Sequence, residues 1–217
     1  MMIHVPGVTA KQAPRGEIFP FQDALDKNLK FRSEKPDDGQ HLSSDALVEA
    51  VDLYATISEL AGLDVPPTCP DNPFHVEFCT EGTSLVPVIK NLTRTSSHDA
   101  TDTGKTLTWK PAVFSQYPRP SVVPGHKSVN PVLDDINIMG YTMRTDQHRY
   151  TEWIAYNHTT FTADWGKVYA RELYIYSSDP LEDVNVAEVA AFQNLSLALS
   201  KQLREGWRKA LPGPGTS

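Results

Sequence analysis

The chain has 217 residues, of which 40% are hydrophobic and 22% are charged, so it can form one packed domain or slightly more. Its formal net charge is −7 with histidine neutral, which argues against nucleic-acid binding because that function needs a basic face. We expect no membrane span and no signal peptide, since the chain has no apolar run of about 18 residues and its first residues lack the required basic and apolar regions.

A helix is predicted at 46–61, after a proline-broken, irregular segment at 9–42. Ser43 or Ser44 is a candidate N-cap, and Gly62 is expected to end the helix in the left-handed conformation. The apolar stripe of this helix implies a partner surface, which the segment before it does not offer. The stripe consists of Leu47, Val51, Tyr54, Ile57, Leu60 and Ala61.

Two cysteines, Cys69 and Cys79, lie in a loop-rich segment at 64–110. Their spacing fits neither the CxxC redox pattern nor a zinc site. They form either a disulfide, which we favour, or two free buried thiols. A polar stretch at 96–105 is the best candidate for a flexible linker, and we place a subdomain boundary there.

Glycosylation sequons occur at Asn91, Asn157 and Asn194. Together with the paired cysteines they indicate a protein of the secretory route. We therefore expect a lysosomal or secreted location, with a truncated N-terminus explaining the missing signal peptide. The seven histidines would bring the formal charge close to zero in an acidic compartment, since their unperturbed pKa is about 6.5.

From 111 onward the pattern changes to strands. Strands are predicted at 112–117, 136–145, 148–157 and 172–177, followed by an amphipathic helix at about 186–210. A tight turn at Asp146 and Gln147 joins the second and third strands in a hairpin. Alternation along 148–157 places two sets of side chains on opposite faces: Tyr150, Glu152, Ile154 and Tyr156 on one, and Thr151, Trp153 and Ala155 on the other. A small antiparallel sheet covered by one helix is an α+β arrangement.

The sequence contains no G-x-S-x-G elbow, no H-E-x-x-H motif and no glycine-rich phosphate loop. The pair Asp134 and Asp135 could bind a cation, but adjacent carboxylates before a strand are usually solvated. The best candidate for binding is the loop SQYPRPSVVPGHKSVNPVLDD at 115–135.

In this loop, Arg119, His126 and Lys127 can supply positive charge to a carboxylate or sulfate, and Tyr117 can supply a ring and a hydroxyl. Its prolines would stiffen the loop and lower the ordering cost of binding. An equally consistent interpretation is that Arg119 pairs with a nearby acid and braces the loop.

The motifs SQYPRP, IMGY, RYT-W and RELY with SDPLED resemble the C-terminal part of the iduronate-2-sulfatases. LYATISELAGLDVPP resembles the helix that ends the sulfatase catalytic domain, and CPDNPFHVEFCTEG resembles the disulfide loop after it. The resemblance implies an α+β C-terminal sulfatase subdomain, preceded by the tail of an α/β alkaline-phosphatase-like catalytic domain. It divides the chain into 1–65, the catalytic-domain remnant; 66–110, the disulfide loop and linker; and 111–217, the C-terminal subdomain.

The same resemblance implies a lysosomal hydrolase that removes 2-O-sulfate from iduronate in heparan and dermatan sulfate. Its formylglycine nucleophile and the ligands of its calcium ion are absent from this chain. The chain alone is therefore expected to be inactive, to shape the substrate pocket and to partner the missing N-terminal catalytic part. A non-catalytic sulfated-glycan-binding module, or a sulfatase acting on another sulfated sugar, are the alternatives.

By resemblance, Cys69 and Cys79 match the family disulfide. Substrate-binding candidates all lie in the loop described above: Tyr117, Arg119, His126, Lys127 and Asn130. Asn130 stands where the family has a substrate-contacting lysine, which leaves the identity of the substrate open.

Overall fold

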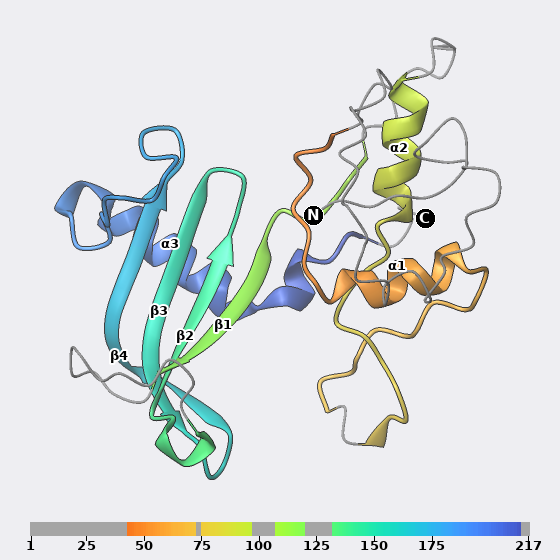
Figure 1. Cartoon of the computed structure of the whole chain (residues 1–217). Coiled ribbons are helices and arrows are strands. Elements are labelled where there is room, and N and C mark those ends of the chain that lie inside the picture. The colour runs from red at the N-terminus through yellow and green to blue at the C-terminus, as the bar shows by residue number, and fades with distance from the viewer. Residues whose placement is uncertain (1–42, 73–74, 97–106, 120–131, 214–217) are drawn as a thin grey trace, which may run out of the picture. The chain divides into compact units, whose positions relative to one another are not determined.

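The computed structural model describes residues 43–72, 75–96, 107–119 and 132–213 (Figure 1). They belong to two compact units, one that includes 86–107 and one formed by Ala46–Leu85 and Thr108–Ser217. The irregular segment at 9–42 and nearly all of the predicted linker lie outside the described residues, and the three-part division stays a prediction. The helices and strands are α1 (Asp52–Leu60), α2 (Val86–Ser96), β1 (Val113–Arg119), β2 (Ile138–Arg144), β3 (His148–Asn157), β4 (Thr162–Ile175) and α3 (Gln193–Glu205).

The strands form one antiparallel sheet in the order β1-β2-β3-β4, which confirms the predicted α+β fold class (Figure 1). The predicted hairpin turn is confirmed as well, because the Thr145 N–H donates to the carbonyl of His148 at 2.8 Å. Strand β4 is longer than the predicted 172–177. Its first part pairs with the end of β3, and register shifts on either side of Ile154 accommodate the extra residues.

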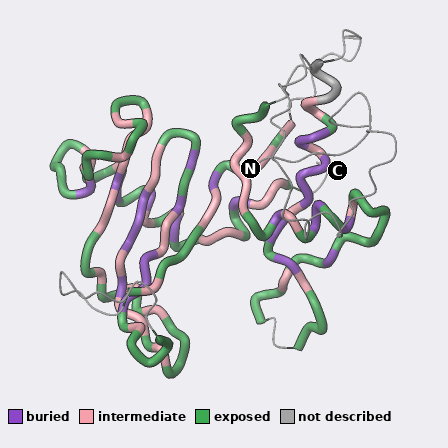
Figure 2. Tube along the Cα trace, in the orientation of Figure 1, coloured by how far each residue is buried: buried purple, intermediate pink, exposed green. Residues whose placement is uncertain are grey.

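One face of the sheet packs against α3 and forms the core. Met143, Tyr150 and Leu173 lie in one cross-strand row on this face and are fully buried, and Leu199 and Leu203 of α3 pack against them. Buried stretches of the sheet and of α3 are purple in Figure 2. Burial of each such side chain contributes about 1.5–3 kcal/mol. The predicted alternation along β3 is therefore confirmed for Tyr150, Glu152 and Ile154, which are all fully buried.

Helix α3 is shorter than the predicted 186–210. A 3-10 helix at Ala190–Phe192 precedes it and another at Trp207–Ala210 follows it. Between them, Gly206 adopts φ 77°, a left-handed conformation that ends the α-helix.

Helix α1 is also shorter than predicted, and the serine caps are wrong. It begins at Asp52, well after Ser43 and Ser44, and its N-cap makes no side-chain hydrogen bond. The predicted C-terminus is confirmed: Gly62 has φ 72°, and Leu63 N–H donates to Ser58 O at 2.9 Å in a Schellman motif.

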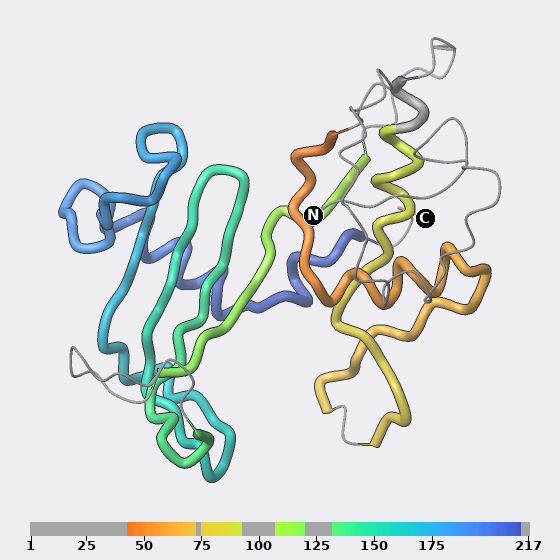
Figure 3. The backbone as a smooth tube through the Cα atoms, viewed as in Figure 1, coloured from red at the N-terminus to blue at the C-terminus, as the bar shows by residue number. Residues whose placement is uncertain are grey.

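The apolar stripe of α1 faces outward. Tyr54 and Ile57 are 54% and 64% exposed, whereas Asp52 and Thr56 on the other side are buried. After α1 the chain makes an excursion closed by the Cys69–Cys79 disulfide and returns beside the start of the helix (Figure 3). The return is close because Gly82 has no Cβ, which would collide with the Val51 carbonyl group. Within the described ranges, this packing leaves the outward face of α1 without a cover.

Candidate functional site

The structure describes two of the predicted substrate-binding residues. Tyr117 and Arg119 project from the same face of β1, where the strand leads into 120–131. The tyrosine is 52% exposed, and the guanidinium carbon of Arg119 lies 4.9 Å from the centroid of the Trp153 ring. This cation–π contact holds the guanidinium against an indole rather than against an acid, and the role of Arg119 stays a prediction. His126, Lys127 and Asn130 lie outside the described residues.

Trp153 is held in place by a glycine and a carboxylate. Tyr117, Gly140 and Trp153 lie in one cross-strand row, and the indole covers Gly140 so closely that a Cβ there would be 2.6 Å from a ring carbon. The indole N–H donates to Glu172 Oε1 at 2.8 Å. The ring is therefore fixed between β2 and β4.

Two arginines lie farther along the same face. Arg149 contacts Glu172 at 3.8 Å and Glu182 at 3.0 Å, and its guanidinium carbon lies 4.8 Å from the Tyr174 ring centroid. Arg144 lies 5.0 Å from the centroid of the Tyr176 ring and forms no ion pair with any described residue.

The Tyr176 hydroxyl next to Arg144 donates to Glu182 at 2.7 Å. Burial, together with this bond to Glu182, raises the pKa of Tyr176 to about 12. The phenol is therefore neutral at physiological pH.

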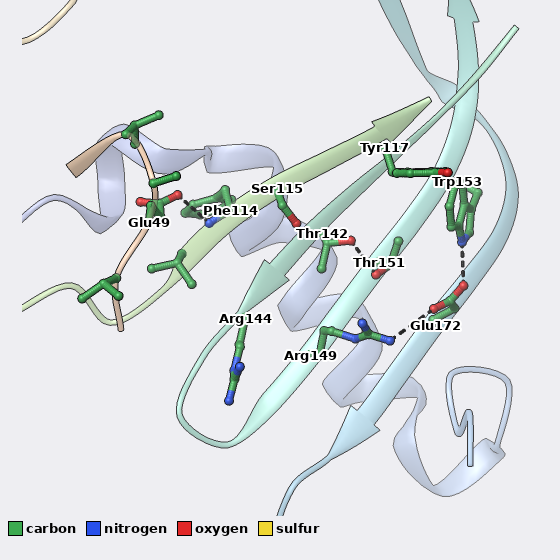
Figure 4. A pocket seen from close by; sticks show the side chains of 14 residues that line it. Glu49, Phe114, Ser115, Tyr117, Thr142, Arg144, Arg149, Thr151, Trp153 and Glu172 are labelled. Carbon is green, nitrogen blue, oxygen red and sulfur yellow. Dashed lines mark hydrogen bonds and ion pairs between the residues drawn. The ribbon is translucent and has the colours of Figure 1, made fainter. Parts of the chain in front are cut away.

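Five of the side chains named above line a cavity of about 630 Å³: Tyr117, Arg144, Arg149, Trp153 and Glu172. We call it the open-face pocket because it lies on the sheet face opposite α3 (Figure 4). The sheet provides its floor, and residues 48–51, which are apolar except for Glu49, provide a wall. The hydroxyls of Thr142 and Thr151 meet in the floor, with their oxygens 2.8 Å apart.

The wall of the pocket is fixed to β1 by a buried ion-pair cluster that the sequence did not indicate. Lys110 donates to Glu49 at 2.7 Å and to Asp52 at 2.6 Å, and Lys110 and Asp52 are almost fully buried. Glu49 also accepts the backbone N–H of Phe114 at 2.8 Å, and Asp52 accepts that of Thr83 at 2.9 Å. The cluster joins three segments that are far apart in the sequence.

A second buried carboxylate, Glu152, lies on the α3 side of the sheet. It accepts hydrogen bonds from Tyr150 at 2.9 Å, Ser200 at 2.7 Å and Arg204 at 2.8 Å. Burial raises its pKa, but these hydrogen bonds together outweigh burial and hold the net pKa below its usual value. Burial and the neighbouring Glu152 charge raise the pKa of Tyr150 to about 12. Because Ser200 and Arg204 belong to α3, the cluster fastens that helix to the sheet.

Among the described residues, no group of three or more His, Cys, Asp or Glu side chains could hold a metal ion. Asp134 and Asp135 lie exposed on a 3-10 helix at Leu133–Asp135. The described part of the chain thus offers no fit for calcium. No helix in the described ranges is long and apolar enough to cross a membrane.

The remaining predicted residues lie at the periphery. The Cys69–Cys79 disulfide is present, and the Arg208 side chain donates to the carbonyls of Cys69 and Pro70. The sequon residues Asn157 and Asn194 are exposed and Asn91 is half-buried. Glycosylation at these positions stays a prediction.

No protein-family model matches the chain. The chain is 40% identical over 187 residues to iduronate 2-sulfatase of Mus musculus and 40% identical over 190 residues to that of Homo sapiens. Each match covers 86% of this chain and 32% of the relative, so the chain spans about a third of the length of the curated relatives it matches. The predicted resemblance to the iduronate-2-sulfatases is thereby confirmed.

Among solved structures, the chain is similar to the phosphonate monoester hydrolase of Agrobacterium radiobacter, at 19% identity and a TM-score of 0.46, covering 79% of this chain and 26% of that one. Another is BT1596, a 2-O GAG sulfatase, at 22% identity and a TM-score of 0.38, covering 71% of this chain and 23% of that one. Both likenesses are too distant to carry a functional argument.

Proposed function

We propose that this chain is the C-terminal part of an iduronate-2-sulfatase, a hydrolase that releases 2-O-sulfate from iduronate in heparan and dermatan sulfate. The observation that carries the proposal is its 40% identity, over 86% of its length, to two curated relatives of that name. The chain spans 32% of each relative. In this proposal, the formylglycine nucleophile and the calcium ligands belong to another, upstream part of the enzyme. The chain alone shapes the substrate pocket and does not catalyse hydrolysis.

The exposed face of α1 supports a partner of this kind. Its outward residues Tyr54, Ile57 and Leu60 are large and apolar, and such a row on one helix face marks an interaction surface. Burial of each would contribute about 1.5–3 kcal/mol. The occupant that we propose is the preceding catalytic part of the same enzyme.

Within the enzyme, the C-terminal sheet positions the substrate-binding loop. Arg119 stacks on Trp153 at the point where β1 leads into that loop, which carries His126, Lys127 and Asn130. The stacking fixes the Arg119 side chain, and a side chain that is already ordered lowers the ordering cost of binding a sugar carboxylate. Tyr117 supplies an exposed ring on the same face of β1.

The test is an activity assay on the chain extended by its upstream reading frame. The substrate is a disaccharide with a non-reducing 2-O-sulfated iduronate, and the comparison substrate carries only a glucosamine 6-O-sulfate. We expect release of sulfate from the first at acidic pH and little from the second. Preference for the second would assign the chain to a sulfatase acting on another sugar. An extended protein that folds and hydrolyses neither would overturn the proposal.

We further propose that the enzyme is lysosomal or secreted and that its sequons are glycosylated. The exposed positions of Asn157 and Asn194 support this. Treatment of the protein from a eukaryotic host with an endoglycosidase should lower its apparent mass, and an unchanged mass would contradict glycosylation.

A further inference from the structure

We propose that the open-face pocket is a binding site for an acidic disaccharide unit of a glycan chain, carrying a sulfate or a carboxylate group. This goes beyond the proposed function, because the site needs no nucleophile and lies on the sheet rather than in the predicted substrate loop. It would hold a part of the glycan that does not react.

The first argument is the order of chemical groups along the pocket floor. The pairing registers place the side chains in three parallel rows. The aromatic row contains Tyr117 and Trp153, the hydroxyl row contains Ser115, Thr142, Thr151 and the carboxylate of Glu172, and the arginine row contains Arg144 and Arg149.

The rows are spaced as two linked sugar rings require. Neighbouring rows are two residues apart along each strand, so the aromatic and arginine rows are separated by roughly 13 Å at about 3.3 Å per residue. The cavity, at about 630 Å³, falls within the usual size of small-ligand pockets, which is about 300–1,000 Å³. The row separation and the cavity volume both suit a disaccharide that lies along the strand direction, from the aromatic row to the arginine row.

Each row offers what one part of such a ligand needs. The exposed ring of Tyr117 can stack on the apolar face of a sugar ring. The hydroxyl row can exchange hydrogen bonds with sugar hydroxyls. Arg144 is exposed and has no ion pair with a described residue, so its guanidinium is available for two parallel bonds to an oxyanion (Figure 4).

The other side chains of the pocket are held before a ligand arrives. Trp153 is fixed by Glu172, and Arg149 is fixed by Glu172 and Glu182. The wall at 48–51 is anchored through Glu49, which bonds to Lys110 and to the backbone of β1. Such pre-organisation reduces the entropy that binding must offset.

The charge balance selects an anion at one end only. Arg149 is partly neutralised by Glu172 and Glu182, whereas Arg144 is not neutralised by a carboxylate among the described residues. A peptide with an apolar face would bury Arg144 without a partner for its charge, which is unfavourable, and would leave the remaining hydrogen-bonding capacity of the hydroxyl row unused. An acidic sugar satisfies both.

The experiment measures binding of a sulfated, heparin-derived disaccharide to the complete 217-residue chain, by tryptophan fluorescence and by NMR shift changes. We expect shifts at Thr142, Thr151 and the Trp153 indole, and a markedly weaker affinity for the same disaccharide without its sulfate groups. Arg144→Gln should raise Kd about tenfold, which corresponds to loss of about 1.4 kcal/mol.

Lys201→Gln is the matched control, because it removes one exposed positive charge from α3, on the other side of the sheet. It should change Kd less than twofold, because salt screens the charge of Lys201 from a ligand bound on the other side of the sheet. Near-UV circular dichroism establishes that each variant is folded.

Equal effects of the two variants would show non-specific attraction and overturn the proposal. So would equal affinity for the desulfated disaccharide, or no binding by a chain whose sheet is folded. None of these results depends on hydrolysis, so failure here leaves the proposed sulfatase function to be judged by its own assay.

Discussion

Replacement of Gly140 by alanine should destabilise the sheet, even though alanine usually stabilises a chain relative to glycine. The new Cβ would lie 2.6–2.9 Å from three carbons of the Trp153 ring, whereas ordinary contacts begin at about 3.4 Å. The ring must therefore move by roughly 1 Å, against its hydrogen bond to Glu172 and its contact with Arg119. Overpacking of this kind costs about 1–3 kcal/mol.

Alanine also reduces the conformational freedom of the unfolded chain, which stabilises the folded state by about 0.4–1 kcal/mol. When this gain is set against the cost of overpacking, the net loss in unfolding free energy should be about 1–2 kcal/mol. Urea unfolding followed by tryptophan fluorescence measures it. Gly166→Ala in β4 is the matched control, since its Cβ would meet only the side chain of Asp164, at 3.2 Å, and should change stability little. A Gly140→Ala variant as stable as the unmodified chain would refute the role given to the indole.

Lys110→Met should lower the unfolding free energy by about 3–5 kcal/mol because it leaves the buried Asp52 carboxylate unpaired, and the double variant Lys110→Met/Asp52→Asn should recover part of that loss in urea unfolding. Because Glu152 has a folded-state pKa below its usual value of 4.5, it contributes stability above that pH that is lost as pH falls through the folded pKa. Glu152→Gln should therefore flatten the acid limb of a stability–pH curve, and an unchanged limb would count against the cluster. Thermal unfolding of the chain alone should show an early transition for α1 before the sheet melts, whereas one cooperative transition would contradict the need for a partner over its exposed face. The purified chain should not hydrolyse a chromogenic sulfate ester, and turnover would show that it contains a nucleophile.

Local patterns predicted the sheet and one of its faces. The sequence of β3 alternates between the two faces, and the turn at Asp146 and Gln147 defines the register of the hairpin with β2. That register already places Arg144 opposite Arg149, so the arginine row could have been inferred from the sequence. The aromatic row could not, since it depends on Gly140 making room for an indole from the next strand.

The errors arise where tertiary contacts override local signals. A helix stripe is normally buried, but in α1 the buried side carries Asp52 and Thr56, because a lysine distant in sequence and the returning chain bind them. Helix α2 was missed inside the loop-rich segment, where its β-branched residues weaken the helical pattern. The early part of β4 was missed because its pairing depends on bulges beside Ile154.

The most direct test of the central claim is the sequence of the transcript upstream of the codon for Met1. If the chain is the C-terminal part of a sulfatase, the reading frame continues upstream and encodes a Cys-x-Pro-Ser-Arg motif together with acidic metal ligands. A continuous upstream frame without that motif, or a stop codon that closes the frame in every transcript, would contradict the claim.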